Sequence, residues 1–470
     1  MSCTKSLPPR GTQKDCSDCS SELSEEFCEL ELVEPESPSH KTERTGPLEK
    51  QEWTKMMDQD GRIINESGLR KAVFKGTSGV SSQLRKEVWR FLYGLYPFSS
   101  TQRERQVILA ENYTKYNAQK NRWKQEIDAY QNIMGEPGGM AVNPKPLYIR
   151  ECEELCKLKH DPEEKESQRA DAFGSIHDNQ RVFLDLTAKV NASRQVIDIE
   201  KLNKSIRSID KDVPRTDRAH PFFKGQGNPN LIVLRDILIT YAAYHQDVGY
   251  AQGMNDILSR FLVVLVAEDE AYSCFANYME HVKGDFLDST MMNKIELVGK
   301  LLKQMDRQLE QHFTSNDMGD LLFVHRWLVL GFKREFCFEE ALKLFEILSS
   351  QHLELSSIEA DRERYKQRSR NREKDGGQFH TELLDLDSAF SFDLFVCLAV
   401  LREHRYLFLK CKEVSGIYNT MNSISMKMDL NTILVKAEDL FFHYCRKSVM
   451  DCFEVVDSLE ATVSRKNRAL

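Results

Sequence analysis

The sequence predicts an all-α protein. From about residue 231 onward the apolar residues recur with the period of a helix, and alternating strand patterns with tight Asn-Gly turns are almost absent. Hydrophobic residues make up 41% and charged residues 29% of the 470 residues, as in soluble globular proteins. A chain of this length has room for more than one core, or for one large core with long insertions. Together these observations predict a large multi-helix domain.

At the N-terminus, residues 1–48 are rich in Ser, Glu, Pro and Lys and nearly lack aromatics, which predicts a disordered tail. Apolar anchors begin to recur near Trp53, so residues 49–75 are expected to form an ordered lead-in to the domain. A helix is expected to begin at Thr101, because Thr101 and Glu104 match the capping box in which each side chain satisfies the backbone of the other.

The next part of the chain, residues 135–200, looks less regular. The glycine-rich run at 135–139 should end any helix, and the proline-rich run at 143–148 reads as extended. The charged run at 161–171 is expected to be a solvated insertion.

The C-terminal half consists mainly of helical patterns. Apolar stripes cover residues 231–244, 254–265, 338–348 and 392–401, and the run 321–330 is apolar nearly all round. That run predicts a helix at the centre of the core. Two further segments interrupt or follow these helices. A charge-dense insertion is expected near residues 355–385, and a C-terminal tail over residues 447–470.

Composition argues against several classes of function. The net charge is −8, so no overall basic field is available to bind nucleic acid. The longest apolar runs, 261–267 and 394–401, are far too short to cross a bilayer, and no secretory signal is visible, so a cytoplasmic protein is expected. The twelve cysteines lack regular spacing, and neither Cys16/Cys19 nor the group Cys152, Cys156 and His160 completes a four-ligand zinc site. No metal is expected.

One candidate functional segment surrounds Arg215. Pro214 fixes the backbone just before it, and Asp212 lies three positions earlier. If that turn is helical, Asp212 and Arg215 share a face and can pair, which would orient the guanidinium. The alternative is a solvated surface arginine in a charged loop, since exposed Arg–Asp neighbours are common.

A second candidate segment contains Gln252. It lies just before Met254, the first residue of a strong amphipathic stripe, so its carboxamide should project from a loop or first turn. Gly249 and Gly253 flank Tyr250 and Gln252 and permit tight turns and the close approach of another backbone. The alternative is a polar residue at a helix entry without a partner. An arginine and a glutamine are also the two side chains that GTP hydrolysis by a GTPase requires.

The chain resembles the TBC-domain family of Rab GTPase-activating proteins. The family motif I-x-x-D-x-x-R is matched by Ile209, Asp212 and Arg215, and the motif Y-x-Q by Tyr250 and Gln252. Arg85 and Trp89 resemble a third fingerprint near the start of the domain, and segments 326–328 and 332–336 also look like family segments. The similarity spans roughly residues 52–446, with the TBC domain itself expected over 76–446. The lead-in resembles the subgroup of the fifteenth, seventeenth and twenty-fifth numbered members.

The resemblance implies a function in trans on a GTP-bound Rab GTPase. Arg215 would neutralise charge that develops on the phosphate oxygens, and Gln252 would orient the attacking water. Arg215 is then called the arginine finger and Gln252 the glutamine finger, and Asp212 and Tyr250 would position them. The protein itself would need no cofactor, because Mg²⁺ and GTP are bound by the partner, and no phosphate-binding loop motif occurs in the sequence. The alternative function is a Rab-binding adaptor that does not accelerate hydrolysis.

Two departures from the family pattern stand out. The usual adjacent glycine pair before the tryptophan fingerprint is replaced by Gly76 and Gly79, which two residues separate. After the glutamine, Arg260 occupies the place where family members often have a proline. Neither departure removes a finger.

The N-terminal tail contains an acid-flanked aromatic-x-x-aliphatic pattern at Phe27 and Leu30. Such patterns bind ubiquitin-like autophagy modifiers by adding a strand to a sheet edge. They also arise by chance in acidic tails. If the match is functional, it indicates recruitment to endosomal or autophagic membranes as a peripheral protein.

Overall fold

The computed structural model describes residues 44–76, 79–134, 146–159, 178–354 and 390–444, all of which belong to one unit, Thr42–Leu470. In this part of the chain the secondary structure is helical, and the β-type pairs are isolated bridges rather than strands. The all-α prediction is confirmed. No helix among the described residues is long and apolar enough to span a bilayer.

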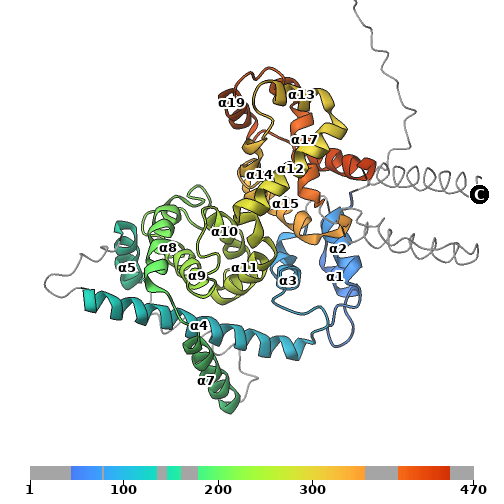
Figure 1. Cartoon of the computed structure of the whole chain (residues 1–470). Coiled ribbons are helices and arrows are strands. Elements are labelled where there is room, and N and C mark those ends of the chain that lie inside the picture. The colour runs from blue at the N-terminus through green and yellow to red at the C-terminus, as the bar shows by residue number, and fades with distance from the viewer. Residues whose placement is uncertain (1–43, 77–78, 135–145, 160–177, 355–389, 445–470) are drawn as a thin grey trace, which may run out of the picture. The chain divides into compact units, whose positions relative to one another are not determined.

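The helices follow one another closely along the chain (Figure 1). The N-terminal set consists of α1 Lys50–Lys55, α2 Glu66–Lys75, α3 Ser82–Leu92, α4 Gln102–Met134, α5 Leu147–Lys159, α7 Asp178–Arg194, α8 Ile199–Asp212, η1 Val213–Arg215, α9 Asn230–Tyr244, α10 Met254–Leu265 and α11 Glu268–Val282. The C-terminal set consists of η2 Lys283–Phe286, α12 Asp288–Met305, α13 Arg307–Ser315, η3 Leu322–Val324, α14 His325–Val329, α15 Phe338–Ser350, α17 Phe392–Glu403, α18 Arg405–Phe408 and α19 Val414–Ile424. Residues 430–444 are also helical.

Two hydrophobic cores hold these sets together. The first is built mainly from α1–α4 and α7–α11, and the second mainly from α12–α19 and residues 430–444. The cores exchange side chains, because Phe74 of α2 lies in the second and Leu342 and Phe345 of α15 lie in the first. α2 and α15 pack against each other and so join the two cores.

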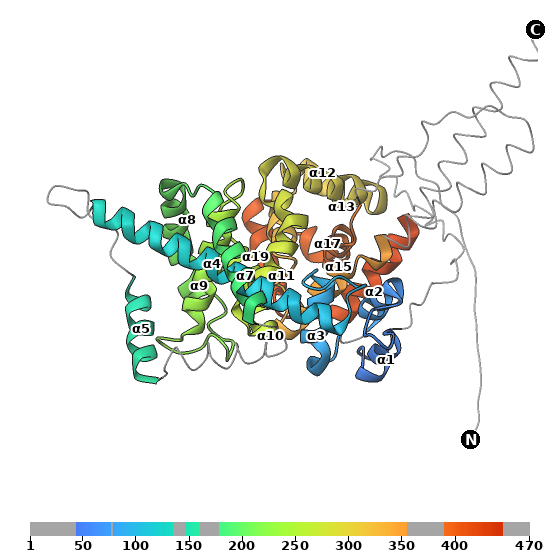
Figure 2. The ribbon, with the colours of Figure 1, turned by 90° about the horizontal axis from the view of Figure 1, so that it is seen from below.

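The long helix α4 organises the first core. It begins as the sequence predicts, because the Thr101 backbone N–H donates to Glu104 Oε2 at 2.7 Å and the Glu104 N–H donates to Thr101 Oγ1 at 3.2 Å. At about 1.5 Å per residue, α4 is roughly 50 Å long, and it contacts α7, α8, α9 and α11 (Figure 2). Trp123 anchors it to α9 by donating to Thr240 Oγ1 at 2.9 Å.

Two predictions about regularity are wrong. Residues 321–330 form the short 3₁₀ helix η3 and the short helix α14, which follow one another directly, rather than one α-helix over the whole run. Leu321, with a φ of 50°, lies just before η3 and keeps the helix from starting earlier. The irregular region expected over 135–200 contains α5 and α7, and the extended run expected over 143–148 gives way to α5 at Leu147. α7 packs on α4 and leaves Val182, Phe183 and Leu186 exposed.

Residues 44–48, which the sequence assigns to the tail, lie against the folded unit. The Thr45 N–H donates to Lys75 O and the Leu48 N–H to Gly79 O, each at 3.1 Å, and Leu48 is buried. The charged run at 161–171, the insertion at 355–385, the C-terminal tail at 447–470 and the motif residues Phe27 and Leu30 lie outside the described residues.

Candidate functional site

The first candidate loop follows α8. Ile209 is fully buried and anchors the last turn of this helix, after which the chain tightens into η1 with Pro214 near its start. A 3₁₀ turn has three residues per turn, so Asp212 and Arg215 share one face. Arg215 Nη2 lies 2.5 Å from Asp212 Oδ1, as the helical-turn interpretation requires. The Arg215 side chain stays 61% exposed, whereas that of Asp212 is only 7% exposed.

The second candidate loop precedes α10. Gly249 and Gly253 have φ values of 66° and 108°, which favour glycine. A Cβ atom at residue 253 would lie 2.9 Å from Leu330 Cδ2, so within this chain the close neighbour at this glycine is a side chain. Gln252 lies between these glycines and is exposed.

Hydrogen bonds join the two loops. Tyr250 Oη donates to Asp212 Oδ2 at 2.7 Å, so one carboxylate binds both Arg215 and Tyr250. Burial, followed by the hydrogen bond to Asp212, raises the pKa of Tyr250 well above its ordinary value and keeps its hydroxyl protonated as a donor. Asn255 Nδ2 also donates to Thr216 Oγ1 at 2.9 Å, which gives a second link. The structure therefore brings the two predicted finger segments together.

Sequence reasoning missed three residues that complete this arrangement, namely Thr216, Asn255 and Lys333. Lys333 is 4% exposed, and its Nζ contacts Asp217 and Asp256, one on each side of the junction between the loops. Lys333 stands in segment 332–336, which looks like a family segment, and Asn255 follows the Y-x-Q motif. Their partners lie far away in sequence, and no local pattern identifies such partners.

The fingerprint residues Arg85 and Trp89 lie away from the finger loops and hold α3 against α15. Arg85 Nε donates to Glu346 Oε1 at 2.6 Å, and Trp89 Nε1 donates to the same oxygen at 2.7 Å. The Val80 N–H donates to the other oxygen at 3.0 Å. Gly79 is required beside them, because its φ is 63° and a Cβ would lie 2.2 Å from Glu346 Oε2. These residues therefore have a structural role here.

Arg260, at the place of the family's proline, is almost completely buried in α10. It donates through Nη2 to Leu330 O, while its guanidinium lies 4.5 Å from the centre of the Phe345 ring. Burial lowers the pKa of Arg260. The helix passes through this position without a break, so the departure from the family pattern is absorbed within the core.

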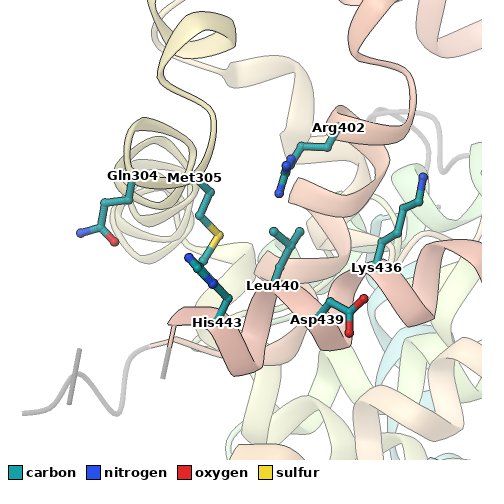
Figure 3. A pocket seen from close by; sticks show the side chains of 7 residues that line it. All are labelled: Gln304, Met305, Arg402, Lys436, Asp439, Leu440 and His443. Atoms are coloured by element: carbon teal, nitrogen blue, oxygen red, sulfur yellow. The ribbon is translucent and has the colours of Figure 1, made fainter. Parts of the chain in front are cut away.

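A separate cavity of about 560 Å³ contains no finger residue. Figure 3 shows the side chains around it, which come from the ends of α12 and α17 and from residues 430–444: Gln304, Met305, Arg402, Lys436, Asp439, Leu440 and His443. The finger residues instead lie on loops that present them outward. Such a geometry suits action on another macromolecule better than enclosure of a small ligand.

Comparison with known proteins identifies the domain that carries these loops. The family model of the Rab-GTPase-TBC domain matches residues 165–360, a range that contains both finger loops. This part of the chain is a TBC domain. The TBC fingerprint residues Arg85 and Trp89 lie before the matched range.

The relatives include TBC1 domain family member 17 of Mus musculus, which is 31% identical over 308 residues covering 65% of this chain and 37% of that protein. GTPase-activating protein GYP7 of Yarrowia lipolytica is 27% identical over 425 residues covering 89% of this chain and 46% of that protein. TBC1 domain family member 25 of Homo sapiens is 28% identical over 305 residues, 64% of this chain and 34% of that protein. The TBC chain described here thus spans less than half of each of these relatives.

The fold has a solved counterpart. The crystal structure of the Ypt/Rab-GAP domain of Gyp1p matches 83% of this chain and 97% of that domain with a TM-score of 0.50 and 15% sequence identity. At this identity the likeness shows the shared TBC fold.

Proposed function

We propose that this protein accelerates GTP hydrolysis by a Rab-family GTPase through Arg215 and Gln252, both supplied in trans. The observation that carries the proposal is the shared carboxylate of Asp212, which bonds the arginine finger at one oxygen and Tyr250 of the glutamine loop at the other. The TBC domain and the name of GTPase-activating protein GYP7 support the same activity.

Arg215 is suited to stabilise charge on a partner's phosphates. Its guanidinium is exposed, and the bond from Nη2 to Asp212 leaves further N–H donors for phosphate oxygens. Asp212 is nearly buried, so it restrains the direction of the side chain without occupying the exposed surface. An arginine finger of this kind raises the hydrolysis rate roughly 10³- to 10⁵-fold.

Gln252 is suited to hold the attacking water. Its carboxamide offers an acceptor and two donors, and it is exposed immediately before the N-terminus of α10. The GTP and Mg²⁺ would be bound by the GTPase, and this chain would contribute only the two side chains and the surface around them.

Single-turnover GTP hydrolysis across a panel of Rab proteins tests the proposal. Arg215→Lys should reduce the stimulated rate by roughly a thousandfold, since lysine keeps the charge but lacks the planar fork of donors. Gln252→Ala should reduce it about a hundredfold. Arg207→Lys changes an exposed arginine of α8 outside the loops and should keep the wild-type rate.

The alternative is an adaptor that binds GTP-loaded Rab without stimulating hydrolysis. If wild-type protein binds a Rab while hydrolysis stays at the intrinsic rate, the adaptor function is correct and the catalytic proposal is rejected. The exposure of both Arg215 and Gln252 favours catalysis, because an adaptor needs neither side chain. Peripheral recruitment to endosomal or autophagic membranes, and binding of a ubiquitin-like modifier through Phe27 and Leu30, remain separate proposals based on the sequence.

A further inference from the structure

A buried lysine lies beneath the junction of the two finger loops. Lys333 belongs to the turn between α14 and α15, and its side chain is only 4% exposed. Its Nζ lies 2.5 Å from Asp217 Oδ2 and 3.1 Å from Asp256 Oδ1, and it donates to Ser259 Oγ at 2.7 Å. All three hydrogens of the ammonium group therefore have acceptors.

The two carboxylates come from different loops. Asp217 lies two residues after Arg215, at a backbone position with a φ of 43°. Asp256 lies four residues after Gln252, in the first turn of α10. Lys333 is thus bonded to the chain just beyond the arginine finger and to the helix that begins just beyond the glutamine finger.

We propose that Lys333 is a positioning residue that fixes the arginine loop against the N-terminal turn of α10, so that Arg215 and Gln252 reach one phosphate group together. This inference rests on the proposed function. Lys333 lies 77 residues from Asp256 and outside both finger motifs. The inference gives this residue a part in the reaction. Lys333 itself lies inside the protein and acts through Asp217 and Asp256.

The charges explain why this lysine matters for the distance between the loops. Without the ammonium group of Lys333, no cation would stand between the nearly buried carboxylates of Asp217 and Asp256. The two carboxylates would then repel each other, because like charges repel strongly when water is excluded. Arg334 pairs with the other oxygen of Asp256 at 2.8 Å, but its side chain is 53% exposed. Among the described residues, Lys333 is the cation that pairs with both Asp217 and Asp256, whereas Arg334 pairs with Asp256.

Two variants test the role of Lys333. Lys333→Met removes the charge and keeps an unbranched apolar side chain, and Asp217→Ala breaks the link from the less buried side, at a side chain that is 16% exposed. Each should lower kcat for stimulated hydrolysis roughly tenfold to a hundredfold through misplacement of the finger, with little change in KM for the GTP-bound Rab. Arg90→Met is the matched control, because it breaks a partly buried ion pair to Glu270 between α3 and α11, which carry no finger.

A cycle with the arginine finger separates positioning from general destabilisation. In an Arg215→Ala background, Asp217→Ala should reduce kcat much less than it does in the wild type, since no arginine remains to be positioned. Equal reductions in both backgrounds, or an unchanged kcat in Lys333→Met and Asp217→Ala, would overturn the inference. If the wild type itself does not stimulate hydrolysis, the proposed function fails first, and the role of Lys333 in it fails with it.

Discussion

At residue 253 the backbone has a φ of 108°, and a Cβ there would lie 2.9 Å from Leu330 Cδ2. Gly253→Ala therefore adds a steric clash of about 1–3 kcal/mol to the cost of the backbone conformation, and it should displace the adjacent Gln252. We expect lower thermal stability and a stimulated hydrolysis rate at least tenfold below wild type, measured by thermal unfolding and single-turnover hydrolysis.

Gly225 provides a control for the backbone conformation alone. Its φ is 98°, and a Cβ there would meet nothing within 4 Å. Gly225→Ala should cost about 1–2 kcal/mol of stability and leave the hydrolysis rate unchanged. Adding Leu330→Ala to Gly253→Ala relieves the clash and should restore part of the rate. A rate in Gly253→Ala equal to that in Gly225→Ala would contradict this account of the loop.

Among the secondary-structure elements, the contact between α3 and α15 depends on one carboxylate. Glu346 is fully buried and accepts from Arg85, Trp89 and the Val80 backbone. Glu346→Ala leaves the Arg85 guanidinium nearly buried, with only Glu339 at 3.3 Å as an ionic partner. We expect a loss of about 3–5 kcal/mol in the free energy of unfolding, measured by urea denaturation.

Glu339→Ala is the matched control for that measurement. Glu339 pairs with the same arginine from α15, but its side chain is 65% exposed, so its removal should cost at most about 1 kcal/mol. Similar losses in the two variants would mean that burial of Glu346 does not determine the strength of this contact.

For the molecule as a whole, the cluster around Asp256 predicts how stability changes in acid. Burial favours a higher pKa for Asp256, but the charges of Lys333 and Arg334 outweigh it and hold the pKa below its ordinary value of 3.8. A carboxyl with a lowered folded-state pKa stabilises the fold above its unfolded-state pKa, and this contribution is lost as the pH falls through the folded value.

Asp256→Asn should therefore be less stable than wild type near neutral pH, and the difference should shrink below about pH 4. Urea denaturation from about pH 7 to about pH 3 measures this difference. Asp439→Asn, at an exposed aspartate within residues 430–444, is the control and should follow the wild-type curve. A difference that stays constant down to pH 3 would show that the charge of Asp256 does not contribute in this way.

What the sequence could predict was mostly local. The capping box at Thr101 and the pairing of Asp212 with Arg215 involve residues three positions apart, so spacing alone indicates them. The form of the run 321–330 was not predicted, because uniform apolarity indicates burial but does not distinguish one α-helix from a 3₁₀ turn followed by a short α-helix. The roles of Lys333 and Glu346 could not be predicted, because their partners lie 74 to 266 residues away, and only the packed helices bring them together.

The bond between the Val80 backbone and Glu346 joins positions 266 residues apart. At a synthesis rate of about 5–20 residues per second, α3 leaves the ribosome roughly 13–53 seconds before α15 is available to it. Throughout that interval the nascent chain carries Arg85 and Trp89 without their acceptor. Protection by chaperones is accordingly most needed between the emergence of residue 80 and that of residue 346, and nascent chains arrested within this window should bind them more than chains arrested after residue 354.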